Sequence, residues 1–151
     1  MFMIPPTPEE GIYNKMFYHG SSKKMKVGKV LKGRGLNYIN DWSSDLVYQI
    51  LEKERPNNYI PHYEAVFMVD NIEDIDNAGG ATDYIFHLKP LGPIERHDMS
   101  FQSEILIAIS DKKSLAEIKL IAKKYWTGIS SKEPVWEYLT REAIITKVEK
   151  Y

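Results

Sequence analysis

The chain contains no cysteine among its 151 residues. This absence excludes disulfide bonds, a thiolate nucleophile and zinc sites with cysteine ligands, and it fits a reducing compartment. Excess charge is absent too, because 20 Lys and Arg stand against 21 Asp and Glu, for a formal net charge of −1. Broad, non-specific binding of nucleic acid is therefore not expected, since such binding depends on a strong positive charge.

The sequence also lacks long apolar runs, internal repeats and low-complexity segments. No stretch is long enough to span a membrane, and residues 1–10 are apolar and then proline-rich, unlike a signal peptide. With 43% hydrophobic residues, a chain of this length can bury a sizeable core. We therefore expect a single cytoplasmic domain over residues 1–151 that does not associate with membranes.

Apolar periodicity and capping signals predict an α+β fold, with helices flanking a β-sheet core. Residues 100–110 suit a strand or a buried helix equally, because periodicity alone does not separate the two. We expect the first, second, third and last predicted strands to share one central sheet. The predicted helices cover 41–55 and 114–126, with a short helix after Asp70, and the predicted strands cover 15–20, 63–69, 83–89, 135–139 and 143–148.

The stretch most indicative of function is 16–22, with the sequence Met-Phe-Tyr-His-Gly-Ser-Ser. Its first residues predict a short buried strand whose end opens into a polar pocket. The strand would fix His19, Gly20 would let the backbone approach a ligand closely, and the two serines would add donors. A strand end followed by a turn, without any further role, is the simpler interpretation of the same residues.

A basic, glycine-punctuated segment follows at 23–35. It could form a hairpin or a loop that crosses the pocket. A solvated loop is the simpler interpretation, and attraction of a phosphate group is the functional alternative. Its cations are Lys23, Lys24, Lys26, Lys29, Lys32 and Arg34.

Three segments together resemble the ADP-ribosyltransferases, which cleave NAD and transfer its ADP-ribose. Residues 17–21 resemble the first motif of the histidine–tyrosine–glutamate branch, which the small rifamycin-modifying enzymes share. Residues 65–70 and the predicted helix after them resemble the second motif, an aromatic-bearing strand leading into a helix. Residues 136–139 and 143–148 resemble the third, where a glutamate opens a late strand. The combination is also similar to small uncharacterised proteins of tailed bacteriophages, which implies the host cytoplasm as the location.

The resemblance implies an ADP-ribosyltransferase-like fold, with NAD as substrate. His19 would bond the adenosine ribose, and the backbone of Gly20 would hold the nicotinamide amide. Phe67 would stack on the nicotinamide, where the family often has a tyrosine. The acceptor of the ADP-ribose, whether protein, nucleic acid or small molecule, is not predicted. The residues assigned to NAD binding are Tyr18, His19, Gly20, Ser21 and Phe67.

The resemblance also implies a catalytic glutamate that stabilises positive charge on the ribose as nicotinamide leaves. A fixed carboxylate is most effective in that role where water is excluded. Glu137 is the preferred candidate, because it sits before the last strand pair, where the family places its acid. Glu104 belongs to a Gln-x-Glu signature found in toxin-like members, and it would be preferred if residues 101–109 formed a strand beside the first motif. A surface carboxylate is the simpler interpretation of both glutamates.

No metal is expected, since the spacing of His62, His87 and the His97–Asp98 pair matches no known metal site and the family is metal-free. Two functions follow from the resemblance: an NAD-dependent ADP-ribosyltransferase, or a catalytically inactive relative that binds a nucleotide or a protein. One cleft shared by His19, Phe67 and a glutamate would favour the enzyme. A glutamate that points away, or an aromatic side chain filling the cleft, would favour the binding module.

Overall fold

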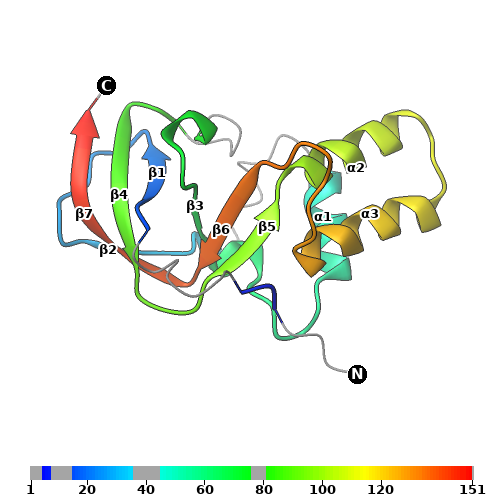
Figure 1. Cartoon of the computed structure of the whole chain (residues 1–151), viewed down its shortest axis with the longest axis horizontal. Coiled ribbons are helices and arrows are strands. Elements are labelled where there is room, and N and C mark those ends of the chain that lie inside the picture. The colour runs from blue at the N-terminus through cyan, green and yellow to red at the C-terminus, as the bar shows by residue number, and fades with distance from the viewer. Residues whose placement is uncertain (1–4, 8–14, 36–44, 76–80, 151) are drawn as a thin grey trace.

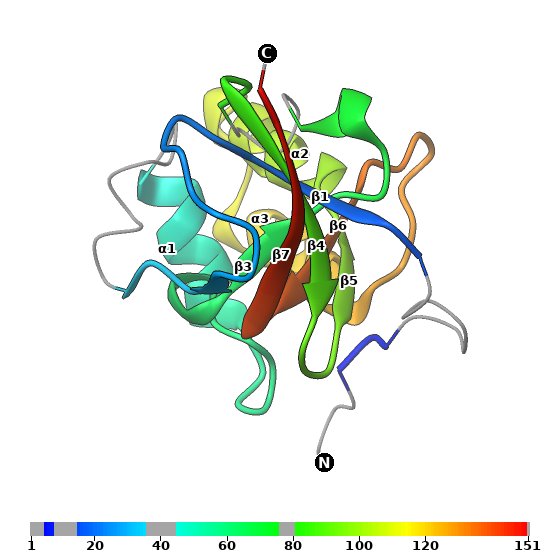
Figure 2. The same cartoon turned by 90° about the vertical axis from the view of Figure 1, so that its left-hand side faces the viewer.

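The computed structural model describes residues 5–7, 15–35, 45–75 and 81–150. These residues form two antiparallel β-sheets and three α-helices, so the predicted α+β class is confirmed. Along the longest axis of the molecule, a four-stranded sheet lies at one end, a three-stranded sheet in the middle and the α-helices at the other end (Figure 1). Viewed from the end that carries the first sheet, the helices lie behind the strands (Figure 2).

The first sheet has the strand order β1-β4-β7-β2, and all its neighbours are antiparallel. The predicted strands at 15–20, 83–89 and 143–148 correspond to three of its members. Its fourth strand lies inside the basic segment, where the sequence left a hairpin or a loop open. The strands are β1 (Phe17–Ser21), β2 (Val30–Lys32), β4 (Tyr84–Pro90) and β7 (Glu142–Lys150).

The second sheet has the strand order β3-β6-β5. Its strands are β3 (Val66–Met68), β5 (Glu95–Asp98) and β6 (Trp136–Thr140). The prediction that 63–69 joins a single central sheet is wrong. Among the described residues, the backbone of that segment pairs with the first sheet at one isolated bridge, where Tyr18 and Val69 exchange two hydrogen bonds of 2.8 and 3.0 Å. Beyond this bridge β1 pairs with β4, whereas β3 pairs with β6, so the strands separate into two sheets.

The α-helices are α1 (Asp45–Glu54), α2 (Ser100–Ser110) and α3 (Leu115–Thr127), and two short 3₁₀ helices are η3 (His62–Glu64) and η4 (Ile72–Asp74). The predicted start of the first helix, 41–44, lies outside the described residues. The third helix begins as its sequence predicts, because the Ser114 hydroxyl accepts the Glu117 N–H at 3.2 Å. It ends at Gly128, whose φ of 76° is the left-handed conformation that favours glycine. The ambiguous segment at 100–110 is helical.

Strand β5 was not predicted, because it does not show the apolar alternation of an ordinary half-buried strand. Its Glu95, His97 and Asp98 side chains are charged or polar, yet all three are buried. Their polar atoms are instead satisfied by hydrogen bonds to other segments, described below. A search for apolar alternation alone therefore does not detect this strand.

Two hydrophobic cores place the second sheet between the other two layers. The core between the sheets includes Phe17, Phe86 and Leu88 of the first sheet and Val66, Met68 and Tyr138 of the second. The other core joins the three α-helices and includes Leu51, Phe101, Ile105, Ala122 and Trp126. No helix in the described ranges combines the length and apolarity needed to cross a membrane.

Candidate functional site

His19 is held in place by the backbone of the neighbouring strand. It projects from β1, and its Nδ1 lies 2.8 Å from the carbonyl oxygen of Phe67 in β3. Because a carbonyl only accepts, Nδ1 carries the hydrogen. Burial, with a smaller contribution from the charge of Arg34, lowers the pKa of His19, whereas the Phe67 hydrogen bond opposes that change. The ring is therefore neutral at pH 7, and its Nε2 is a hydrogen-bond acceptor.

The other residues of the first motif have structural partners. A Cβ at Gly20 would lie 2.1 Å from the carbonyl oxygen of Ala81, so a side chain is excluded there by packing alone. The Ser21 hydroxyl accepts the Lys23 N–H at 3.0 Å and closes the turn after β1. Tyr18 projects to the opposite face from His19, where its ring meets the His87 ring edge-on at 5.0 Å. These contacts explain the three residues without a ligand.

Phe67 is the point where the first two motifs meet. Its carbonyl holds His19, as described above, while its ring packs against Ile60, Ala65 and Leu139 on the side of the second sheet that faces the helices. The ring centroid lies 5.5 Å from that of His62. The structure therefore brings His19 and Phe67 together through the backbone, and it leaves the Phe67 ring only partly buried.

Glu137 lies on β6 opposite His97 of β5, and only 2% of it is exposed. The Tyr125 hydroxyl of α3 donates a short hydrogen bond to its Oε1, and the Gln102 amide of α2 lies 3.4 Å from the same oxygen. Burial raises the pKa of Glu137 to about 7. The Tyr125 hydrogen bond opposes this rise, and the charge of Asp98 adds to it. The carboxyl group is thus partly protonated at neutral pH.

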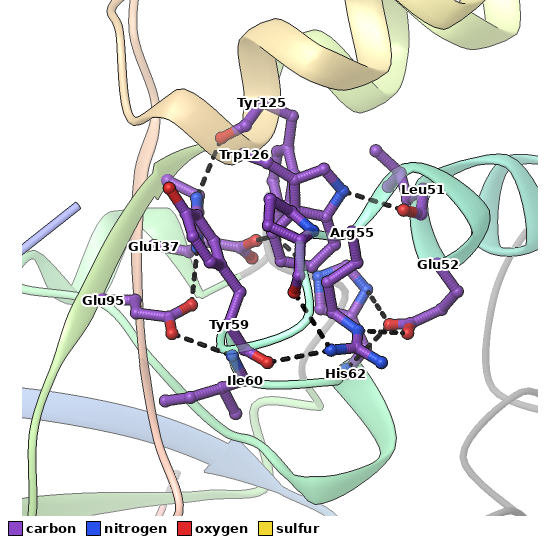
Figure 3. Close-up of polar contacts among 12 residues, drawn as sticks. Leu51, Glu52, Arg55, Tyr59, Ile60, His62, Glu95, Tyr125, Trp126 and Glu137 are labelled. Carbon is purple, nitrogen blue, oxygen red and sulfur yellow. Dashed lines mark hydrogen bonds and ion pairs between the residues drawn. The ribbon is translucent and has the colours of Figure 1, made fainter. Parts of the chain in front are cut away.

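A chain of polar contacts continues from Glu137 through Tyr125 to His62 and Glu52 (Figure 3). Since Tyr125 gives its hydrogen to Glu137, its oxygen accepts from Nε2 of His62 at 2.8 Å. Burial, followed by the charges of His97 and Arg55, lowers the pKa of His62 well below its ordinary value. The backbone N–H of His62 donates to Oε1 of Glu52 at 2.8 Å. This series of polar contacts therefore links β6, α3, η3 and α1.

A second branch leaves the same tyrosine through its backbone. The Tyr125 carbonyl lies 2.8 Å from Nδ1 of His97, and Nε2 of His97 lies 3.0 Å from Oε1 of Glu95. The other oxygen of Glu95 accepts the Ile60 N–H at 2.8 Å. Both ring nitrogens of His97 thus face oxygen atoms, those of the Tyr125 carbonyl and of the buried Glu95 carboxyl group.

Asp98 completes the polar interior. Its carboxylate accepts backbone N–H groups from Ser100, Ser131 and Val135 at 2.9, 2.7 and 3.0 Å. Burial alone would raise the pKa of Asp98, but these hydrogen bonds together outweigh burial and lower it. Within the described ranges, no group of three or more His, Asp or Glu side chains is placed to hold a metal ion.

The predicted site residues fall into two neighbouring but separate environments. His19 lies at the crossing of β1 and β3, whereas Glu137 is buried under α3, with His62 between the Phe67 ring and the network. Glu104 is exposed on α2, so the condition for preferring it, a strand at 101–109, is not met.

Sequence reasoning missed Tyr125 and His62 as partners of Glu137. The spacing of apolar residues along α3 places Tyr125 on the buried face of the helix, and a buried tyrosine needs a partner for its hydroxyl. That requirement was the available signal, but it does not name the partner.

Chemically, Glu137 can take up and release a proton near neutral pH. Its Oε1 is occupied by Tyr125, and its low exposure prevents direct contact with a sugar in the described arrangement. His19 offers a fixed acceptor, and the partly buried Phe67 offers part of an aromatic ring. In comparisons with known proteins, no protein-family model matches this chain, and no curated protein matches it.

Proposed function

We propose that the chain has an ADP-ribosyltransferase-like fold and binds NAD, or a related dinucleotide, beside His19 without cleaving it. The burial of Glu137 under Tyr125 carries this proposal. In the family that the sequence resembles, the glutamate contacts the nicotinamide ribose as charge develops there. Here the corresponding carboxyl group has an internal partner and almost no exposed surface, which favours binding over turnover.

The tautomer of His19 supports a binding role for the first motif. With Nδ1–H fixed on the Phe67 carbonyl, the ring presents Nε2 as an acceptor, and a ribose hydroxyl is a suitable donor for it. Because β1 and β3 both hold the ring, its orientation is set before a ligand arrives, which lowers the entropic cost of binding.

A second candidate is the active transferase, and one observation favours it. Phe67 and Glu137 lie on neighbouring strands and on the same side of the second sheet. If α3 moved so that Tyr125 released Glu137, the carboxylate would face the side that carries the Phe67 ring. In that case catalysis would require the carboxylate, because a neutral amide cannot oppose the positive charge that develops on the ribose.

The test of binding is thermal unfolding with increasing NAD, for the parent protein and for His19→Asn. Asparagine can keep the hydrogen bond to the Phe67 carbonyl while removing Nε2, so the fold should persist. We expect NAD to stabilise the parent in a concentration-dependent way and to leave His19→Asn unaffected. Equal stabilisation of both proteins would show that NAD does not use His19.

Turnover is measured in the same samples as nicotinamide release and as transfer of label from NAD to a lysate. We expect neither for the parent nor for Glu137→Gln. Release by the parent that falls roughly 100- to 1,000-fold in Glu137→Gln, with NAD stabilisation kept, would instead establish the active transferase.

A further inference from the structure

An exposed groove lies between α2 and α3, the helices at the opposite end of the molecule from the first sheet (Figure 1). Its floor is apolar and consists of Ile107, Ala108 and Ile121, with Ile107 60% exposed. The rim is charged. It carries three carboxylates and one ammonium group, from Glu104, Asp111, Glu117 and Lys113.

The acidic rim is not neutralised internally. In the part of the chain that the structure describes, none of the three carboxylates takes part in an ion pair. An exposed apolar floor with a net negative rim is complementary to a segment that presents an apolar side chain between cations. Such a segment is present in the same protein, at the opposite end of the folded molecule (Figure 1).

That segment is a tight turn at 26–29. The Lys29 N–H donates to the Lys26 carbonyl at 3.1 Å, and Gly28 has a φ of 92°, so Val27 lies at the tip, where it is 61% exposed. The turn is fixed to β7, because Gly28 and Lys29 each form a backbone hydrogen bond with Ile145, of 2.8 and 2.9 Å. Val27 is thus an apolar residue on a rigid support.

The surroundings of Val27 are basic. Residues 22–35 contain no Asp or Glu. Of the six cations in this segment, Lys32 lies 3.6 Å from Glu142. Four others, which are Lys23, Lys24, Lys26 and Lys29, form no ion pair among the described residues.

We propose that the 26–29 turn of one copy docks into the α2–α3 groove of a second copy. Val27 enters against Ile107, Ala108 and Ile121, and the lysines of the turn face the acidic rim. The occupant is a second copy because the turn and the groove lie at opposite ends of one molecule, so a chain cannot fill its own groove (Figure 1). Because the two surfaces differ, the contact is head-to-tail and extends into a ring or an open chain of molecules.

The contact is small and electrostatic, so its dissociation constant should be on the order of 100 μM at low ionic strength. It should weaken as salt is added, because exposed charges are screened. The test is sedimentation velocity of the full chain over a concentration series, at low and at high ionic strength. We expect association that increases with concentration and decreases with salt.

Two sets of neutralising substitutions separate the surfaces. The groove variant is Glu104→Gln/Asp111→Asn, and the turn variant is Lys26→Gln/Val27→Ser/Lys29→Gln. Each should associate at least about tenfold more weakly than the parent, since it loses exposed ion pairs. Controls with the same changes in charge at exposed positions elsewhere should associate like the parent; they are Glu73→Gln/Glu133→Gln and Lys123→Gln/Lys132→Gln.

Mixing the two variants tests the head-to-tail geometry. The groove variant keeps an intact turn and the turn variant keeps an intact groove, so an equimolar mixture should form a 1:1 dimer that does not grow further. A parent protein that stays monomeric up to about 1 mM would overturn the proposal, since a contact of this strength would be populated there. Association that persists in either variant alone, or a mixture that stays monomeric, would also overturn it.

Discussion

Replacing Glu137 by glutamine should make the protein more stable at high pH than at low pH, relative to the parent. Burial raises the pKa of Glu137 from its ordinary value of about 4.5 to about 7. Glutamine resembles the protonated carboxyl group in shape, its oxygen can still accept the Tyr125 hydrogen, and it never ionises. The two proteins therefore differ mainly in the cost of placing a negative charge in the interior.

The sign follows from the direction of the shift. A carboxyl group whose pKa is raised in the folded state binds its proton more tightly there than in the unfolded chain. Its contribution to the free energy of unfolding is fully present below about pH 4.5 and is lost as the pH rises to about 7. A shift of about 2.5 units at 1.36 kcal/mol each corresponds to about 3 kcal/mol. Glu137→Gln escapes this loss.

The assay is urea denaturation, followed by tryptophan fluorescence, at several pH values between about 4.5 and 8, a range that brackets the shift. The free-energy difference between Glu137→Gln and the parent should change by about 3 kcal/mol in favour of the variant across that range. Glu104→Gln, which removes an exposed carboxylate from α2, is the matched control and should show almost no change with pH. A difference for Glu137→Gln that is equally flat would refute the reasoning, because it would mean that the buried carboxylate carries no desolvation cost.

Two further substitutions test the surroundings of the site. Tyr125→Phe removes the hydroxyl between Glu137 and His62, so it should destabilise the protein by roughly 1–3 kcal/mol. It should also raise the pKa of Glu137 further, so that the loss of stability with rising pH extends to higher pH. An unchanged pH profile of stability would contradict the hydrogen bond between Tyr125 and Glu137. Gly20→Ala places a Cβ 2.1 Å from the Ala81 carbonyl oxygen, so it should lower the free energy of unfolding by about 1–3 kcal/mol. The melting temperature should fall accordingly, even without any ligand. An unaffected melting temperature would show that the 81–83 segment moves aside freely.

Local signals predicted the elements that depend on nearby residues. Helix α3 is delimited by Ser114 and Glu117 at its start and by Gly128 at its end. These ends were predictable because a helix cap requires only residues a few positions apart. The alternation in 83–89 likewise predicted β4, since its apolar side chains face the core between the sheets. The partner of β3 could not be read in this way, because pairing with β6 joins residues about seventy positions apart.

The candidate site was predictable only in part. The strand and the turn around His19 follow from residues 16–22 themselves. The surroundings of Glu137 do not, because its partners Tyr125 and Gln102 come from two helices, and the histidine behind them comes from η3. Charged residues are ordinarily read as exposed, so the buried Glu95, His97 and Asp98 gave no signal of an interior position.

Asp98 has a consequence for the order of folding. Its three amide donors belong to the first turn of α2 and to two points of the 131–135 segment, which follows α3. The carboxylate is buried as β5 pairs with β6, and two of its three donors arrive only when the chain has returned past both helices. Until then, the Ser100 N–H, two residues away, is the one donor of the three within reach, so the desolvation cost of Asp98 is only partly compensated. The hydrogen bonds from Ser131 and Val135 therefore form only when the structure is nearly complete, so they should slow unfolding more than they speed folding. The β5–α2 junction thus contributes to the kinetic stability of the protein.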